Sequence, residues 1–177
     1  ARPSVCRCCR AEPLWRWMLL SLFGPLDNLI SPAPEAARVA FLRARPFAHR
    51  GLHGPGVLEN SRAAFTAAVD GGFGIELDVQ ASREGEAFVF HDSELDRLAD
   101  ATGSFAALRG VELEKIRLKG CDETIPRLSE ILDLVAGRAP ILIEIKIEKG
   151  PVGVLCLAVR RALEGYNGPV AVMSFHS

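Results

Sequence analysis

The sequence contains no long hydrophobic run and no marked excess of one charge. No stretch of its 177 residues approaches the roughly 18 consecutive apolar residues of a membrane-spanning helix. Its 21 lysines and arginines nearly balance 22 aspartates and glutamates, which argues against a nucleic-acid-binding protein that depends on overall basicity. Internal repeats and low-complexity tracts are also absent. With 49% hydrophobic residues, the composition is that of an ordinary globular domain.

The few cysteines are unevenly placed. Cys6, Cys8 and Cys9 lie at the N-terminus, and the other two are Cys121 and Cys156. No second Cys/His cluster follows to complete a zinc site, and an odd, scattered set does not form a disulfide framework. We therefore expect the protein to reside in a reducing compartment.

The N-terminal region differs from the rest of the chain. Residues 1–17 are rich in Arg, Cys and Trp. We predict that residues 1–45 form an extension and helices that cap the bottom of the fold, with Met18 as the natural start and a cytoplasmic location. Two alternatives stay open. A signal peptide cleaved near Ala33 would export the protein, and a helix over residues 14–30 could contact a membrane surface peripherally.

The remainder alternates strand patterns with helical patterns. Strands are predicted at residues 46–49, 74–80, 87–91, 141–147 and 170–175. Helices are predicted at about 61–70, 127–136 and 152–164, with Asn60 or Ser61 as the N-cap of the first. Strand followed by helix, repeated, predicts a parallel α/β sheet. Residues 93–120, opened by Leu95-Asp96-Arg97-Leu98, interrupt the alternation and are a predicted insertion.

Two predicted strands have one polar face, although parallel strands covered on both faces are normally apolar throughout. In the second strand the residues of one face are Ile75, Leu77 and Val79, and those of the other are Glu76, Asp78 and Gln80. In the fourth, isoleucines occupy positions 141, 143, 145 and 147, and the opposite face has Glu144, Lys146 and Glu148.

A solvated sheet face or an edge strand would explain either polar face alone. Helices flank both strands, however, so the apolar faces must meet those helices. The carboxylates then point to the other side, which in a closed barrel is the interior. Acidic groups there are costly unless they are paired or bind a cation. Three carboxylates (Glu76, Asp78 and Glu144) beside Lys146 therefore predict a metal site.

Two histidines end predicted strands. His49 is followed by Arg50 and His91 by Asp92, and the active site of a parallel barrel lies at the carboxyl ends of its strands. We predict that these two histidines are functional. His53, in a glycine-rich loop, and His176, at the terminus, are predicted to be non-essential. The strand parity predicts that Ala87, Val89 and His91 face inward and that Phe88 and Phe90 face the helices.

Five short motifs occur in the order of a known family. They are Ala48-His49-Arg50-Gly51, Glu59-Asn60-Ser61, Glu76-Leu77-Asp78, His91-Asp92 and Glu144-Ile145-Lys146. Over residues 47–175 the chain resembles the glycerophosphodiester phosphodiesterases. The resemblance implies a TIM (β/α)8 barrel with a small insertion after strand 3, here residues 93–120. Because such a barrel takes about 250 residues, we expect residues 46–177 to be a partial domain, truncated after about five strands.

The resemblance also implies roles for individual residues. The metal ligands would be Glu76, Asp78 and Glu144, whose hard oxygen atoms suit Mg²⁺ or Ca²⁺ better than zinc. The general acid and base would be His49 and His91. The phosphate contacts would be Arg50 and Lys146, with Glu59 orienting Arg50 and Asn60 near the metal.

The expected reaction is the metal-dependent hydrolysis of a small-molecule glycerophosphodiester to glycerol 3-phosphate and an alcohol, in glycerophospholipid catabolism. Either a neighbouring substrate hydroxyl or water attacks the phosphorus, and the sequence leaves both routes open. One alternative is a lysophospholipase D-type enzyme on the same site with a more apolar substrate. The other is a catalytically inert truncated fragment or a partner-binding module.

Overall fold

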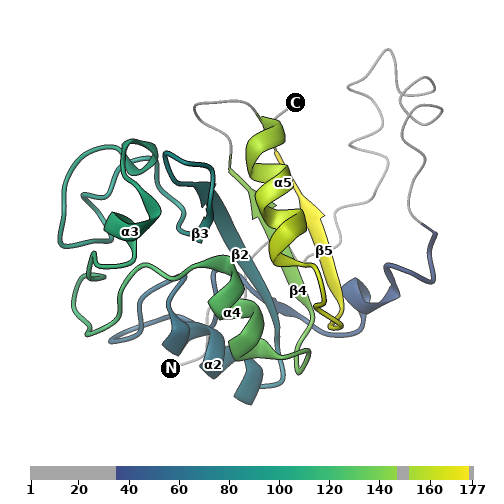
Figure 1. Cartoon of the computed structure of the whole chain (residues 1–177). Helices are drawn as coiled ribbons and strands as arrows, with labels where there is room; N and C mark the ends of the chain where they lie inside the picture. Colours follow the sequence, from purple (N-terminus) through teal and green to yellow (C-terminus); the bar gives the residue numbers. More distant parts are fainter. Residues whose placement is uncertain (1–34, 147–151, 176–177) are drawn as a thin grey trace, which may run out of the picture.

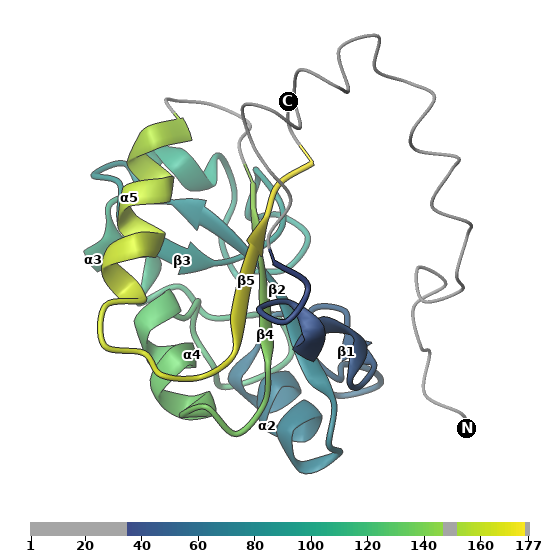
Figure 2. The same cartoon turned by 90° about the vertical axis from the view of Figure 1, so that its right-hand side faces the viewer.

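The computed structural model describes residues 35–146 and 152–175. Within these ranges one sheet has the strand order β1-β2-β4-β5, and β3 pairs with β2 beside that path (Figure 1 and Figure 2). The strands are β1 (Phe47–Ala48), β2 (Gly74–Ala81), β3 (Ala87–Val89), β4 (Ile141–Ile145) and β5 (Val170–Met173). The helices are α2 (Arg62–Asp70), α3 (Gly110–Leu113), α4 (Leu128–Val135) and α5 (Val152–Ala162), with short 3₁₀ helices η3 (Ala40–Arg43) and η4 (Phe105–Ala107).

Several sequence predictions lie outside the described residues. These are the extension up to residue 34, with its signal-peptide and membrane-surface alternatives, together with Ile147, Glu148 and His176. Among the residues that are described, no helix is long and apolar enough to cross a membrane.

The long helices form where the hydrophobic periodicity predicts them. Helix α2 begins after Ser61, whose hydroxyl accepts a hydrogen bond from the Ala64 amide at 3.1 Å. Helix α4 buries Leu128, Ile131, Leu132 and Val135 and ends at Ala136, which has a left-handed backbone. Helices α2, α4 and α5 all pack against the same side of the sheet, and α4 and α5 lie to the left of β5 in Figure 2.

The main hydrophobic core lies between these helices and the sheet. The residues that β2 and β4 contribute are Ile75, Leu77, Val79, Ile141, Ile143 and Ile145. They are the faces predicted to be apolar. The polar faces of both strands therefore point away from the helices, as expected.

The main strands run parallel, as in part of a (β/α)8 barrel. Strand β2 pairs in parallel with β1 and with β4, and β4 pairs in parallel with β5. In the β2–β4 register, Asp78 lies opposite Glu144. This pairing brings two strands that are far apart in the sequence into direct contact at their polar residues.

Strand β3 differs from the prediction. It pairs antiparallel with β2, with Val79 opposite Val89. The two strands are joined by residues 82–86 alone, and a parallel crossover needs a dozen residues or more. The parallel part of the described sheet is therefore β1, β2, β4 and β5, and the expectation that β3 is a further parallel strand was wrong.

The predicted inward and outward faces of β3 were also wrong. Val89 joins the main core on the helix side, and Ala87 packs against that core. Phe88 and Phe90 instead belong to a second hydrophobic cluster, formed with the insertion. The cause is the hairpin, which turns β3 away from the barrel path and gives its aromatic side chains a separate core to fill.

This second core makes the insertion a folded unit beside the carboxyl end of β2. Its buried members within the insertion are Leu95, Leu98, Ala99, Phe105, Leu113 and Leu118. The ring of Phe105 stacks on that of Phe90 with centroids 5.2 Å apart. The Arg127 guanidinium lies 4.8 Å from the centre of the Phe88 ring and pairs with Glu114 of the insertion at 3.0 Å.

Candidate active site

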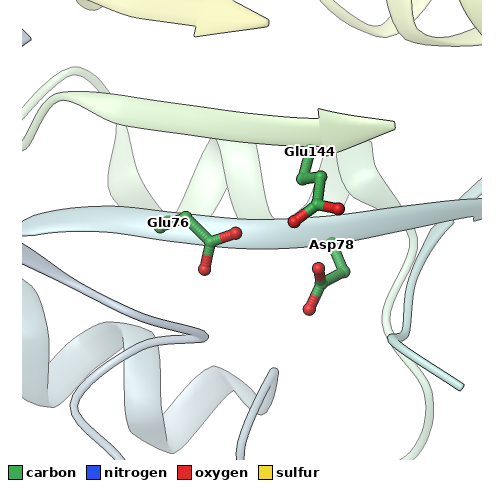
Figure 3. Close-up of side chains that lie close together, drawn as sticks. All are labelled: Glu76, Asp78 and Glu144. Atoms are coloured by element: carbon green, nitrogen blue, oxygen red, sulfur yellow. The ribbon is translucent and has the colours of Figure 1, made fainter. Parts of the chain in front are cut away.

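Three carboxylates from β2 and β4 meet on the polar side of the sheet. One oxygen atom each of Glu76, Asp78 and Glu144 lies within 4.8 Å of the others, and all three side chains are buried. Figure 3 shows the three side chains gathered beside the two strands. We call this group the acidic cluster. It is the juxtaposition that the alternating sequence pattern predicted.

Two cations and an amide lie against the acidic cluster. The Lys146 ammonium lies 2.6 Å from a Glu144 oxygen and 3.3 Å from Asp78 Oδ1. The Arg50 Nε atom lies 3.2 Å from Asp78 Oδ2, and the Asn60 amide donates to the same oxygen at 2.9 Å. Two positive charges thus face three carboxylates. The local charge balance leaves room for a cation.

Two carboxylate oxygens of the cluster support this inference. Glu76 Oε1 is buried and has no hydrogen-bond donor among the described residues, and the only cation near the buried Asp78 Oδ1 there is Lys146, at 3.3 Å. Burial, together with the nearby charges of Asp78 and Glu144, raises the pKa of Glu76 to about 7. Buried oxygen atoms without donors are costly, and hard oxygen ligands are those that Mg²⁺ and Ca²⁺ use. The acidic cluster therefore fits a divalent cation.

The loop after β1 is held in an uncommon conformation. Arg50 and Asn60 both have positive φ angles, of 57° and 56°. The backbone amide of Asn60 donates a hydrogen bond to the Arg50 carbonyl at 2.9 Å. Gly51 has φ of 80°, and a Cβ atom there would lie 2.8 Å from Ala64 Cβ of α2. This conformation turns the Arg50 amide toward the cluster, where it donates to Glu76 Oε2 at 2.9 Å.

His49 lies beside the acidic cluster. Its Nε2 atom is 3.9 Å from Glu76 Oε2, and about half of its side chain is exposed. Burial, and then the positive charge of Arg50, lower the pKa of His49. Its imidazole is therefore predominantly neutral near pH 7, the form that accepts a proton.

Glu59 holds the Arg50 side chain, as predicted. The Arg50 guanidinium donates to Glu59 Oε1 at 2.7 Å, and Arg97 of the insertion donates to both oxygens of Glu59. Although burial opposes ionisation, the hydrogen bonds from Arg97 and Arg50 lower the pKa of Glu59 to about 2. Glu59 is thus a fixed negative charge that orients a positive one.

His91 is oriented by its neighbour. Its Nδ1 atom lies 2.7 Å from Asp92 Oδ1. The Gln80 amide donates to the carbonyls of Phe90 and Asp92 at 3.3 and 2.5 Å. These two bonds tie the segment around His91 to the carboxyl end of β2. His91 follows the hairpin strand β3, which ends at Val89, rather than a parallel barrel strand.

The sequence is similar to proteins of one known family. A model of the glycerophosphoryl diester phosphodiesterase family matches residues 49–167. The chain belongs to this family. It is 37% identical over 110 residues to a glycerophosphodiester phosphodiesterase of Caldanaerobacter subterraneus, covering 58% of this chain and 44% of the relative. It is 33% identical over 127 residues to human glycerophosphodiester phosphodiesterase 1, covering 64% of this chain and 37% of the relative.

Solved structures agree with the family assignment. A phosphodiesterase from Oleispira antarctica, in complex with the product sn-glycerol-3-phosphate, matches with a TM-score of 0.70 and 27% identity, covering 76% of this chain and 60% of that one. The glycerophosphodiester phosphodiesterase of Agrobacterium tumefaciens matches with a TM-score of 0.60 and 31% identity, covering 74% of this chain and 57% of that one. The chain spans less than half the length of the two curated relatives compared above.

In this member of the family, the structure brings most of the predicted site residues into one hydrogen-bonded and ion-paired group. The acidic cluster is linked directly to Arg50, Asn60 and Lys146, and through Arg50 to Glu59. His49 lies within 3.9 Å of Glu76. His53, predicted to be non-essential, is not a member of the cluster but lies close enough that its positive charge would lower the pKa of His49.

Three residues were overlooked as contributors to this site. Gln80 donates a hydrogen bond to the Asp92 carbonyl, and the Asp92 side chain lies against His91. Arg97 donates to Glu59, which in turn holds Arg50. Signals were present in the sequence. Gln80 shares the inward face of Glu76 and Asp78, and Asp92 and Arg97 are charged residues within motifs that were already noted. Only the folded insertion shows that the Arg97 side chain contacts Glu59.

Proposed function

We propose that the protein hydrolyses glycerophosphodiesters to glycerol 3-phosphate and an alcohol, with a divalent cation as cofactor. The observation that carries the proposal is the buried acidic cluster, in which Glu76 Oε1 has no hydrogen-bond donor among the described residues, set beside Arg50 and Lys146. Membership of the family supports the reaction type. The Oleispira antarctica phosphodiesterase, which binds sn-glycerol-3-phosphate, supports the product.

The cofactor proposal is Mg²⁺ or Ca²⁺ held by Glu76, Asp78 and Glu144. When bound, such an ion supplies positive charge to phosphate oxygens and offsets the negative charge that develops on them. The charge balance of the cluster supports this ligand set, because two cations face three carboxylates. An all-oxygen donor set is typical of these two ions and not of zinc.

The substrate phosphate is proposed to contact Arg50 and Lys146. Both side chains are less than one fifth exposed and sit against the acidic cluster. The planar guanidinium of Arg50 can bind two phosphate oxygens at once. Glu59 restrains Arg50 from the other side at 2.7 Å, which lowers the entropy that Arg50 loses when it binds an anion.

Proton transfer is assigned to His49 and His91. Hydrolysis needs one group that accepts a proton from the attacking hydroxyl and one that donates a proton to the leaving alcohol oxygen. The lowered pKa of His49 favours its neutral form at pH 7. Asp92 beside Nδ1 of His91 orients that ring.

The attacking hydroxyl distinguishes two routes. If a hydroxyl of the substrate's own glycerol attacks, a cyclic phosphodiester forms first and water opens it. If water attacks directly, no cyclic product appears. Phosphorus NMR during turnover of glycerophosphocholine distinguishes the routes by the transient cyclic resonance.

The decisive experiment uses the intact protein that contains this chain. We expect release of glycerol 3-phosphate from glycerophosphocholine, loss of that activity in excess chelator, and its return on addition of Mg²⁺ or Ca²⁺. Replacing Glu76, Asp78 or Glu144 by Ala should abolish activity while circular dichroism stays unchanged. Full activity in chelator would refute the metal dependence. Turnover of lysophosphatidylcholine in preference to glycerophosphocholine would favour the lysophospholipase D alternative.

The domain layout and location are proposals as well. We propose that residues 46–177 belong to the catalytic domain, that residues 1–45 are an extension with Met18 as the natural start, and that the protein is cytoplasmic. The clustering of arginine, cysteine and tryptophan in residues 1–17 motivates the extension. Deleting residues 1–17 should leave activity of the intact protein unchanged. Export with cleavage near Ala33 would show the signal-peptide alternative to be right.

A further inference from the structure

Arg97, at the start of the insertion, bridges two carboxylates that come from different parts of the chain. Its Nε and one terminal nitrogen donate to the two oxygens of Asp92 at 2.6 and 2.7 Å. Its two terminal nitrogens donate to the two oxygens of Glu59 at 2.8 and 3.2 Å. All three guanidinium nitrogens are therefore engaged, and each carboxylate receives two hydrogen bonds from one arginine.

Each of these carboxylates also holds a residue of the proposed site. Glu59 Oε1 accepts a hydrogen bond from Arg50 at 2.7 Å, and Asp92 Oδ1 lies 2.7 Å from His91 Nδ1. A continuous chain of hydrogen-bonded side chains thus runs from Arg50 through Glu59, Arg97 and Asp92 to His91. Arg97 is its central member and the one contributed by the insertion.

We propose that Arg97 is a positioning residue that acts through Glu59 and Asp92 on Arg50 and His91. This inference rests on the proposed function and adds a residue to it. Without Arg97, Asp92 loses two hydrogen bonds and can rotate away from Nδ1 of His91. Glu59 and Asp92 then lie near each other without their shared counter-charge. The insertion therefore contributes directly to the geometry of the site.

A purely stabilising role for Arg97 is disfavoured by its surroundings. Half of its side chain is exposed, although its partners Glu59 and Asp92 are mostly buried, and solvent screening reduces what such a half-exposed ion pair contributes to stability. The insertion is fastened independently by its own buried core and by Arg127, which pairs with Glu114. Loss of Arg97 should therefore change the site more than the fold.

The kinetic test compares Arg97→Met with a matched control, Arg117→Met, in the intact protein. Arg117 also belongs to the insertion, but among the described residues it pairs with the fully exposed Asp122 and not with a residue of the site. We expect Arg97→Met to lower kcat by about 10–100-fold, the range typical for loss of a group that orients a residue of the site by hydrogen bonding, with KM changed less than about threefold. The control should stay within about twofold, and both variants should keep the parent's thermal midpoint. A raised KM with unchanged kcat would overturn the proposal, because Arg97 would then be a substrate contact.

A lysine variant and a double-mutant cycle sharpen the test. Arg97→Lys keeps the charge but cannot form the two-pronged bonds, so its kcat should remain at least about fivefold below the parent. In a His91→Ala background, Arg97→Met should lower kcat by a smaller factor than in the parent, because the branch through Asp92 to His91 is already lost and only the branch through Glu59 to Arg50 remains. Full activity of Arg97→Lys, or an undiminished loss in the His91→Ala background, would contradict the proposal.

One measurement does not depend on activity. Nitrogen NMR of the His91 imidazole should show a single tautomer, with the proton on Nδ1 facing Asp92, in the parent protein and in Arg117→Met. Arg97→Met should show a mixture of tautomers. An unchanged tautomer population in Arg97→Met would refute the positioning role even if the protein hydrolyses glycerophosphodiesters. A mixture of tautomers would support it even if the substrate proved to be different.

Discussion

At the residue scale, the acidic cluster stores unfavourable electrostatic energy. Glu76 is almost fully buried beside Asp78 and Glu144, and burial with these charges raises its pKa to about 7. Between pH 4.5 and 7 the folded protein therefore binds a proton that the unfolded chain releases. The free energy of unfolding contributed by Glu76 falls as the pH rises through this interval.

The first prediction follows from this pH dependence of the free energy of unfolding. In chelator, Glu76→Gln should raise the free energy of unfolding of the intact protein at pH 8, by the order of 1–3 kcal/mol, and should have little effect at pH 4.5. Urea denaturation at the two pH values measures the difference. Added Mg²⁺ or Ca²⁺ should stabilise the parent and not the variant. A variant that is less stable than the parent at pH 8 in chelator would contradict the prediction.

The second prediction concerns the two histidines. Because acid and base act on opposite sides of the phosphorus, His49→Ala and His91→Ala should each lower turnover by about 10²–10⁴-fold. The double variant should lose far less than the product of the two. A nitrophenyl ester needs no proton on its leaving group, so it should rescue only the variant that lacks the general acid.

Two other histidines serve as controls for this assignment. His53→Ala and His176→Ala should remain near the parent activity. If His53→Ala is as inactive as His49→Ala, the assignment of roles is wrong. The same conclusion holds if neither His49→Ala nor His91→Ala loses more than a few-fold.

At the scale of elements, the alternating strands were the most informative part of the sequence. Apolar and polar residues alternate through most of β2, and in β4 only Leu142 departs from the alternation, so the side of the sheet that each residue faces follows from parity. The placement of Glu76, Asp78 and Glu144 could therefore be predicted before their contacts were known. The N-cap of α2 at Ser61 could also be predicted from local sequence, because it depends on a side chain and a backbone amide three residues apart.

What could not be predicted depends on non-local packing. Strand β3 was expected to be parallel because local patterns do not show which strand lies beside it. The short connection to β2 was the available signal. Phe88 and Phe90 were predicted to face the helices, yet they lie in the hydrophobic core of the insertion. Arg97 was overlooked for the same reason, since Glu59 is 38 positions away in the sequence.

The third prediction tests the N-cap of α2, which lies next to Asn60 of the site. The buried Ser61 hydroxyl accepts from the Ala64 amide at 3.1 Å and donates to the Leu58 carbonyl at 2.6 Å. Ser61→Ala should lower the free energy of unfolding by about 1–2 kcal/mol. Thr66→Ala, at an exposed position of the same helix, should change it by less than about 0.5 kcal/mol. Equal effects of both variants in urea denaturation would show that the cap does not matter.

At the scale of the whole molecule, the sheet is covered unevenly. Among the described residues β5 pairs with β4 alone, and its Val172 is 46% exposed. Phe175 beyond it and Leu157 on α5 are 77% and 51% exposed. The relatives are more than twice as long as the segment they share with this chain. An unpaired strand edge beside exposed apolar side chains favours association with another surface.

The last prediction follows from that surface. Residues 1–177 expressed alone should aggregate or bind a hydrophobic dye strongly, because none of the described residues covers the edge of β5 or the exposed apolar side chains of α5. Replacing Val172 and Leu157 by Lys should reduce both effects, whereas Val111→Lys, at an exposed apolar position of the insertion, should not. Light scattering and dye fluorescence measure the difference. A soluble monomer with a sharp, cooperative thermal transition would contradict the prediction. A stable dimer abolished by the two lysines would instead mean that two open sheets cover each other, because only a contact through β5 and α5 places both substituted residues at the interface.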